Sequence, residues 1–311
     1  MGLLSRFERL APDRRGLLGS FPLVACLLLL ISPADAEEPW TYTATAFVDR
    51  SAVNADDDEP GTVLRLQPRY GGGLTANRTY DVQTDRKLAL GFGVSTERYP
   101  ETSEQNRLFF DAGMDYIVPL NKGTLRQLQF GIDLRHADDD DDWIYNRARI
   151  EASLRFQPAR RNTIRVRGRV GYRDQNDNYT FEGYDQAEYL IDLMHNWRSV
   201  DGLWRTTSML YYEHREADSD YYTYNEAGVR LIGRRKLTDA TDFVGRITTF
   251  VRDYEDGIRK DHRFRGTLGI DWNLGNEVVL ESYAGYQKNW STLEEKAYSG
   301  GIFGIAISKV F

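Results

Sequence analysis

The residues best suited to do chemistry in this sequence are arginines that share one parity over two neighbouring stretches. They occupy alternate positions in residues 147–155 and again in residues 165–173, after a polar turn at 159–162. The seven are Arg147, Arg149, Arg155, Arg165, Arg167, Arg169 and Arg173. Arginine keeps its charge at any relevant pH and makes bidentate contacts with carboxylate, sulfate and phosphate groups. Stacked on one face, these side chains would form a ladder that an anionic solute could follow.

Two interpretations of this arginine face are open. Further arginines have the parity that we assign to the same face: Arg65, Arg69, Arg107, Arg135, Arg205, Arg230, Arg234, Arg246, Arg252 and Arg265. Acids with that parity could neutralise them by pairing: Asp111, Asp115, Asp133, Glu151, Glu188, Asp192, Glu226, Asp271 and Glu281. Within residues 147–173, Glu151 is the only acid of this parity, so a solute path stays open on that stretch beside internal ion pairs.

Other candidate sites are weaker. The four histidines, none of them in a His-x-Ser or His-x-x-x-His context, are His136, His195, His214 and His262. A hydrolase would need an Asp–His or Ser–His arrangement, and no spacing singles one out. The acidic runs at 56–59 and 138–142 lack the spaced oxygens and the glycine turn of a calcium loop. We therefore predict no catalytic residue, no metal site and no cofactor, and nothing indicates nucleic acid.

The elements that position these arginines must have apolar and polar residues in strict alternation. In residues 147–156 every even position is apolar and every odd position is charged or hydroxylated. A helix, with its period of 3.6, could not separate these two sets, whereas a strand does so. We predict fourteen strands, centred near Ala44, Leu66, Phe92, Met114, Phe130, Ala152, Arg167, Ile191, Ser208, Val229, Thr248, Leu268, Ala284 and Ile305. In the second strand, Pro68 and the glycines at 71–73 predict a bulge or irregularity.

The connections between these strands alternate in length. The short turns are at 121–123, 159–162, 199–202 and 275–277, and the longer, acidic loops are at 55–61, 138–142, 174–185, 216–220, 253–261 and 291–296. This layout is typical of a transmembrane β-barrel. A closed barrel also leaves no backbone group unpaired in lipid. We expect an all-β, antiparallel, up-and-down barrel of about fourteen strands, within a range of twelve to sixteen, with both termini in the periplasm.

Three features separate a membrane barrel from a soluble sandwich, which also alternates. The arginine face is too charged for a sandwich core. Aromatic residues of the apolar parity fall at two heights: Phe156, Trp197, Trp204, Trp272 and Phe311 near the short turns, and Tyr172, Tyr189, Tyr212 and Tyr286 near the long loops. Two such belts mark the two membrane interfaces. The chain also ends on Phe311, at a position whose parity faces the lipid. His136 and His195 have the same lipid-facing parity in their strands.

The overall composition agrees with this architecture. The 311 residues include 47 acidic and 40 basic side chains, giving a net charge of -7, and the mean hydropathy is -0.56. Only residues 17–31 approach the roughly 20 apolar residues of a spanning helix, which excludes a helical membrane protein. Residues 1–36, with a basic start, an apolar run and Ala34-Asp35-Ala36, are typical of a signal peptide. Residues 37–311 then form one barrel domain without cysteine.

Residues 37–311 resemble a Gram-negative outer-membrane β-barrel of the porin-like kind. Residues 46–51 with Asp57-Asp58 and residues 63–68 are similar to the opening of barrel porins that accompany exopolysaccharide export systems. Residues 305–311 resemble the C-terminal signature that the barrel-assembly machinery reads, here at Phe311, although Lys309 replaces the usual apolar residue. The size is also similar to the fourteen-stranded barrel of surface-lipoprotein assembly modifiers.

The resemblance implies an integral outer-membrane protein that contacts lipid and lipopolysaccharide. We expect a non-enzymatic, porin-like channel for small anionic solutes, such as acidic sugars or oligosaccharides, through an arginine-lined lumen. One alternative is a non-conducting accessory barrel that works with components of a polysaccharide or lipoprotein export system. A second alternative is an outer-membrane hydrolase with a site at the rim, near His136, His214 or His262.

Overall fold

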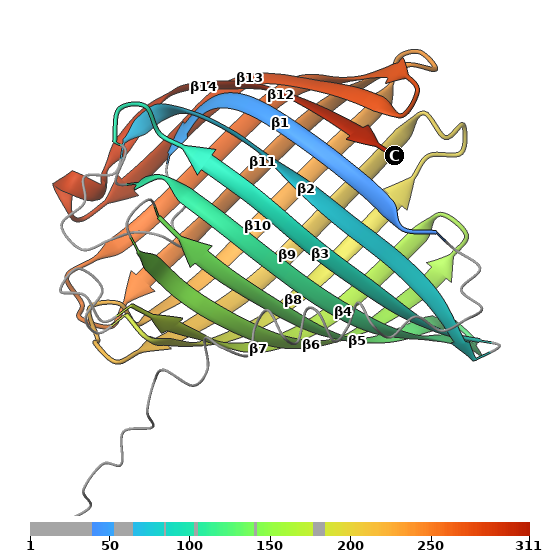
Figure 1. The fold of residues 1–311 in the computed structure, drawn as a ribbon, viewed down its shortest axis with the longest axis horizontal. Helices are drawn as coiled ribbons and strands as arrows, with labels where there is room; N and C mark the ends of the chain where they lie inside the picture. Colours follow the sequence, from blue (N-terminus) through green and yellow to red (C-terminus); the bar gives the residue numbers. More distant parts are fainter. Residues whose placement is uncertain (1–38, 53–64, 84, 103–104, 140–141, 177–183) are drawn as a thin grey trace, which may run out of the picture. The chain divides into compact units, whose positions relative to one another are not determined.

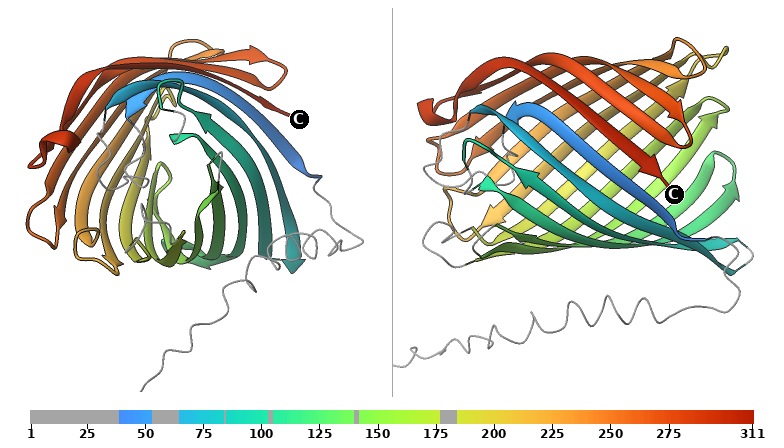
Figure 2. Two further views of the ribbon diagram at one scale, coloured as in Figure 1. Left: turned by 60° about the vertical axis from the view of Figure 1, so that its left-hand side comes forward. Right: turned by 45° about the horizontal axis from the view of Figure 1, so that its top comes forward.

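The computed structural model of the protein describes residues 39–52, 65–83, 85–102, 105–139, 142–176 and 184–311. They form a closed barrel in which each strand pairs with its neighbours in the chain (Figures 1 and 2). The strands are β1 (Thr41–Ala52), β2 (Leu66–Gln83), β3 (Arg86–Arg98), β4 (Arg107–Lys122), β5 (Leu125–Asp138), β6 (Trp143–Ala159), β7 (Asn162–Gln175), β8 (Gln186–Arg198), β9 (Trp204–Ala217), β10 (Tyr224–Lys236), β11 (Thr241–Tyr254), β12 (Lys260–Gly275), β13 (Val278–Ser291) and β14 (Tyr298–Val310). The predicted barrel of fourteen antiparallel strands is confirmed.

The barrel closes through pairing of the first strand with the last. Thr43 stands opposite Val310 and Arg50 opposite Phe303, with an unbroken register between them. Beyond this ladder, the amide of Phe311 donates a hydrogen bond of 2.9 Å to the carbonyl of Tyr42. Pairing every strand on both sides satisfies the backbone inside a bilayer, where water cannot do so.

Short and long connections lie at opposite ends of the barrel, as expected. We call these the short-turn end and the long-loop end; the described connections β9–β10, β11–β12 and β13–β14 at the long-loop end lie at the left in Figure 1. The short turn after β8 is held by Asp201, whose carboxylate accepts hydrogen bonds from the Ser199 hydroxyl and the Leu203 amide. These two bonds hold the pKa of Asp201 below its usual value. Of the predicted loops, 55–61 lies outside the described residues.

The two faces of the wall differ as the alternation predicts. Large apolar side chains that lie exposed on the outer face include Ile150 (60%), Ile191 (57%), Leu268 (61%) and Phe303 (58%). Side chains of the opposite parity on the same strands are polar and often buried. Both aromatic belts are present, with exposed side chains of Trp197, Trp204, Trp272 and Phe311 toward the short-turn end and Tyr172, Tyr189, Tyr212 and Tyr286 toward the long-loop end.

The prediction for the second strand was wrong in two respects. Leu66 is the first residue of β2, not its centre, and the register with β1 is continuous through Pro68 and the glycines. Pro68 is tolerated because β3 pairs with β2 only from Tyr70 onward, so Pro68 has a strand on one side alone. The glycines permit close packing, since a Cβ on Gly71 would lie 2.8 Å from the ring of Phe47. The irregularity occurs at Asp81 to Gln83 instead.

All fourteen strands belong to one compact unit, Glu38–Phe311. The signal peptide predicted at 1–36 lies outside the described residues. Among the residues that the structure describes, no helix has the length and apolar composition needed to cross a membrane.

Candidate functional site

The seven predicted arginines all have the lumen-facing parity of β6 and β7. Their neighbours Ile150, Val166 and Val170 are exposed on the outer face, while Arg173 is fully buried and Arg147 and Arg149 nearly so. Across the ladder, Arg147 stands opposite Arg173 and Arg155 opposite Arg165, so the two strands do bring like charges together. Carboxylates from other strands are needed to offset this repulsion.

The first source of compensation is Glu188 of β8, which has a side chain only 1% exposed. Its carboxylate lies 2.5 Å from Nε of Arg149, 3.6 Å from Nε of Arg173 and 3.9 Å from Nη1 of Arg215. Arg215 also contacts Glu213 at 2.9 Å. A buried carboxylate shared by three guanidinium groups forms a compact ionic cluster near the long-loop end.

Gly171 makes the contact between Arg149 and Glu188 geometrically feasible. Arg149 on β6 stands opposite Gly171 on β7, which in turn stands opposite Glu188 on β8. A Cβ on Gly171 would lie 2.7 Å from Cγ of Arg149. The missing side chain therefore lets Arg149 cross an entire strand to reach its partner.

A second cluster surrounds Arg167 in the middle of β7. Its guanidinium lies 2.6 Å from the carboxylate of Asp192 on β8 and 3.0 Å from that of Glu151 on β6. Arg165 contacts the same Asp192 at 3.5 Å. Arg147 contacts Asp133 on β5 at 3.5 Å, so internal pairing describes five of the seven predicted arginines: Arg147, Arg149, Arg165, Arg167 and Arg173.

The long-loop end of the lumen is further filled by aromatic rings that the sequence analysis did not single out. The guanidinium of Arg173 lies 4.4 Å from the ring centre of Tyr145, and that of Arg252 lies 4.0 Å from the ring centre of Tyr224. Such stacking is favourable for a desolvated cation. The sequence feature that could have identified these rings is an aromatic residue at the same alternate positions of a strand as its arginines, as Tyr145 is. Tyr145 and Tyr224 are themselves buried at this end of the barrel.

Among the described residues, the lumen arginines without a carboxylate within 4.0 Å include Arg263 and Arg265 on β12, which contact aromatic side chains instead, and four on β6, β7, β9 and β10. Arg155 and Arg169 belong to the predicted face, and Arg205 and Arg230 lie on β9 and β10. Arg155, Arg205 and Arg230 are exposed, and Arg169 is half-buried with an Nε that has no hydrogen-bond partner. These four side chains present positive charge to whatever occupies the lumen.

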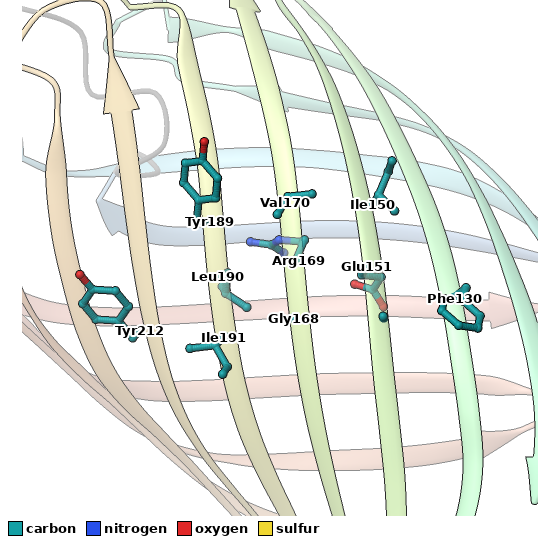
Figure 3. A pocket seen from close by; sticks show the side chains of 11 residues that line it. Phe130, Ile150, Glu151, Gly168, Arg169, Val170, Tyr189, Leu190, Ile191 and Tyr212 are labelled. Atoms are coloured by element: carbon teal, nitrogen blue, oxygen red, sulfur yellow. The ribbon is translucent and has the colours of Figure 1, made fainter.

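Two of the hollows in the wall differ in character. The larger, of about 600 Å³, is an apolar depression on the outer face of β5–β9 around Gly168 (Figure 3). It is lined by side chains such as Phe130, Ile150 and Ile191, so it suits contact with lipid hydrocarbon and not with a polar solute. The smaller, of about 290 Å³, opens to the lumen and is lined by Arg230, Ile232, Arg246, Thr248, Arg265, Thr267 and Tyr283.

The histidines contact neighbours on the outer face. His195 lies 3.0 Å from the amide oxygen of Asn162, and His214 lies 3.0 Å from that of Asn225. His262 lies 3.2 Å from the Thr249 hydroxyl and stacks on a tryptophan. His136 alone has a carboxylate contact in the described structure, with Asp138 at 2.8 Å. Within the same part of the chain, no group of three or more metal-ligating side chains occurs.

The chain is similar to known proteins in fold and not in sequence. The sequence matches no protein-family model and no curated protein sequence. OmpT, an outer-membrane protein of Vibrio cholerae, matches with a TM-score of 0.52 and 9% identity, over 89% of this chain and 100% of that chain. An outer-membrane channel of Pseudomonas putida F1 matches with a TM-score of 0.52 and 10% identity, over 90% of this chain and 100% of that chain.

The outer-membrane channel DcaP of Acinetobacter baumannii is a third similar structure. It matches with a TM-score of 0.52 and 13% identity, over 90% of this chain and 99% of that chain. At these identities the likeness concerns the fold, and it agrees with the closed barrel and its apolar outer face. The chain therefore has the fold of a porin-like outer-membrane β-barrel.

Proposed function

We propose that this barrel is a porin-like channel that favours small anionic solutes, acidic sugars and oligosaccharides among them. The observation that carries the proposal is that several lumen arginines have no carboxylate partner, among them Arg155, Arg169, Arg205 and Arg230. A fixed cation in a narrow, protein-walled lumen attracts anions and repels cations more strongly than the same charge would in open water.

The paired arginines have a different part in this proposal. The clusters around Glu188 and Asp192 hold β6 to β9 in a fixed arrangement and leave the unpaired guanidinium groups oriented toward the lumen. A passing anion then exchanges contacts from one arginine to the next, as conduction requires sites that bind and also release. In this proposal the selectivity comes from fixed arginine side chains and does not require any strand or loop to move.

The surroundings follow from the fold. We place the short-turn end in the periplasm, the rule for bacterial outer-membrane barrels, and the apolar outer face against outer-membrane lipid and lipopolysaccharide. Residues 1–36 would direct export as a signal peptide, and Phe311 would be read by the barrel-assembly machinery. The proposed channel has no enzymatic site.

Planar-bilayer recording of the purified barrel tests the proposal. Under a potassium chloride gradient, we expect ion conductance with a reversal potential of the sign that chloride permeation produces. Cation selectivity would overturn the preference for anions. A correctly folded barrel without conductance would overturn the channel itself.

The ionic and aromatic filling of the long-loop end favours one second candidate, a non-conducting accessory barrel for polysaccharide or lipoprotein export. Glu188, Arg173 and Tyr145 are nearly inaccessible to solvent, so they are closely packed on the lumen side of the wall. This candidate predicts a closed wild-type barrel in the bilayer experiment. It also predicts that loosening the cluster, for example with Glu188→Gln, opens a conductance.

A further inference from the structure

The lumen-side cavity on β10–β13 has a regular construction. Arg230 on β10, Thr248 on β11 and Arg265 on β12 stand directly opposite one another in a single row of the sheet. Arg246 lies one row nearer the short-turn end, opposite Thr267. Because neighbouring strands lie about 4.8 Å apart, the two outer arginines of the row have Cα atoms roughly 10 Å apart. Their long side chains can therefore converge on one small group held above Thr248.

The positive charge of this cavity is only weakly compensated. Within the described residues, Arg230 has no carboxylate inside 4.0 Å. Arg246 forms an ion pair with Glu281 at 3.5 Å and lies 4.0 Å from Asp271. Asp271 makes its shorter contact elsewhere, with Arg234 at 2.8 Å. Glu281 is 45% exposed and is thus well solvated, which weakens its pull on Arg246.

The third arginine is held by a phenol and not by a carboxylate. Nη2 of Arg265 donates a hydrogen bond of 3.2 Å to the hydroxyl of Tyr283. That hydroxyl donates in turn to Asp49, at 3.1 Å, from across the β1–β14 closure. The arrangement fixes the guanidinium while leaving its remaining donors available to a ligand. Thr248 and Thr267 add hydroxyl donors to the floor of the cavity.

We propose that this cavity is a binding subsite for the carboxylate group of a small organic anion. Planar guanidinium groups on two sides match the two oxygens of a carboxylate, and the threonine hydroxyls can complete its hydrogen bonding. Ile232 and the ring of Tyr283 provide apolar contact for the organic part of the solute. A volume of about 290 Å³ is at the lower limit of ligand cavities, so the solute is small. The identification of the ligand as a transported solute rests on the proposed function.

Saturation-transfer NMR on the full barrel in detergent micelles tests the subsite, because it detects weak binding without requiring conductance. The probe is glucuronate, with glucose as the neutral comparison and succinate or inorganic phosphate as competitors. Arg230→Gln and Arg265→Gln remove the flanking cations. The matched control is Arg235→Gln, the same change on β10 but on the outer face, where Arg235 stacks on Trp204.

We expect saturable glucuronate binding that weakens about tenfold or more in Arg230→Gln and Arg265→Gln and stays within about twofold of wild type in Arg235→Gln. Succinate should displace glucuronate more effectively than phosphate does. Thr248→Val, which keeps the side-chain shape, should also weaken binding and serves if an arginine variant fails to fold. Equal signals from glucose and glucuronate, or better displacement by phosphate, would overturn the carboxylate subsite.

The two experiments distinguish a failure of the proposed subsite from a failure of the proposed channel. An anion-selective barrel without saturable glucuronate binding would remove the subsite and leave the channel. Glucuronate binding that depends on Arg230 in a barrel without anion selectivity would remove the channel and leave the cavity as a binding site.

Discussion

Glu188 on β8 and Arg149 on β6 form an ion pair of 2.5 Å although the whole of β7 runs between them. The pair crosses β7 at Gly171, and its carboxylate is shared with Arg173 and Arg215. One buried acid thus compensates three arginines from three strands. This cluster explains how β6 and β7 tolerate so many like charges.

Replacing Glu188 by Gln should therefore destabilise the barrel. Arg149, Arg173 and Arg215 would stay buried without their shared carboxylate, a situation that typically costs about 3 kcal/mol or more. We expect a lower denaturant midpoint for unfolding in detergent micelles. The matched control is Glu281→Gln, since Glu281 is half-exposed and makes one ion pair of 3.5 Å. Equal midpoints for the two variants would contradict this account of the cluster.

Arg167 and Arg169, two residues apart on β7, should differ in their effect on stability. Arg167→Gln leaves Asp192, with a side chain 1% exposed, facing only Arg165 at 3.5 Å, so the free energy of unfolding should fall by about 2 kcal/mol. Arg169→Gln removes a half-buried cation whose Nε has no partner, so stability should be unchanged or higher. Both can be compared by equilibrium unfolding in urea. A larger loss for Arg169→Gln would refute the assignment of paired and unpaired arginines.

The rim histidines should not support hydrolysis. His136 has the contact closest to a catalytic pair, with Asp138 at 2.8 Å on the outer face. His214 and His262 contact an amide and a hydroxyl instead. We expect no cleavage of phospholipid or peptide substrates above a protein-free background, measured for wild type and for the three His→Ala variants. Cleavage by wild type that disappears in His136→Ala would establish the hydrolase alternative.

Phe311 should matter for assembly more than for the finished barrel. Its backbone pairs with Tyr42, while its side chain is 63% exposed beside Lys309. Phe311→Ser keeps the backbone pairing and removes the aromatic group that we expect the assembly machinery to recognise. The variant should accumulate in the outer membrane at a markedly lower level than wild type, measured by fractionation and blotting. Its conductance after refolding from denaturant should match wild type, and normal accumulation would count against the recognition role.

The strands were predictable because the bilayer and the lumen impose opposite demands on alternate residues, as at Ile150 and Arg149. The pairing of charges was less predictable, since counting acids along β6 and β7 found only Glu151. The partners Glu188 and Asp192 come from β8, and their heights depend on the register of three strands. The same holds for Arg230, Thr248 and Arg265, whose common row appears only once β10–β12 are aligned. In β2, glycines that suggested an irregularity serve close packing against Phe47 instead.

The central claim, that unpaired lumen arginines set a preference for anions, is tested most directly by the reversal potential under a potassium chloride gradient. Wild type is compared with a variant in which Arg155, Arg169, Arg205 and Arg230 are all changed to Gln. Wild type should be anion-selective, and the variant should shift clearly toward cation selectivity while keeping a measurable conductance. A cation-selective wild type, or the same reversal potential for both proteins, would contradict the claim.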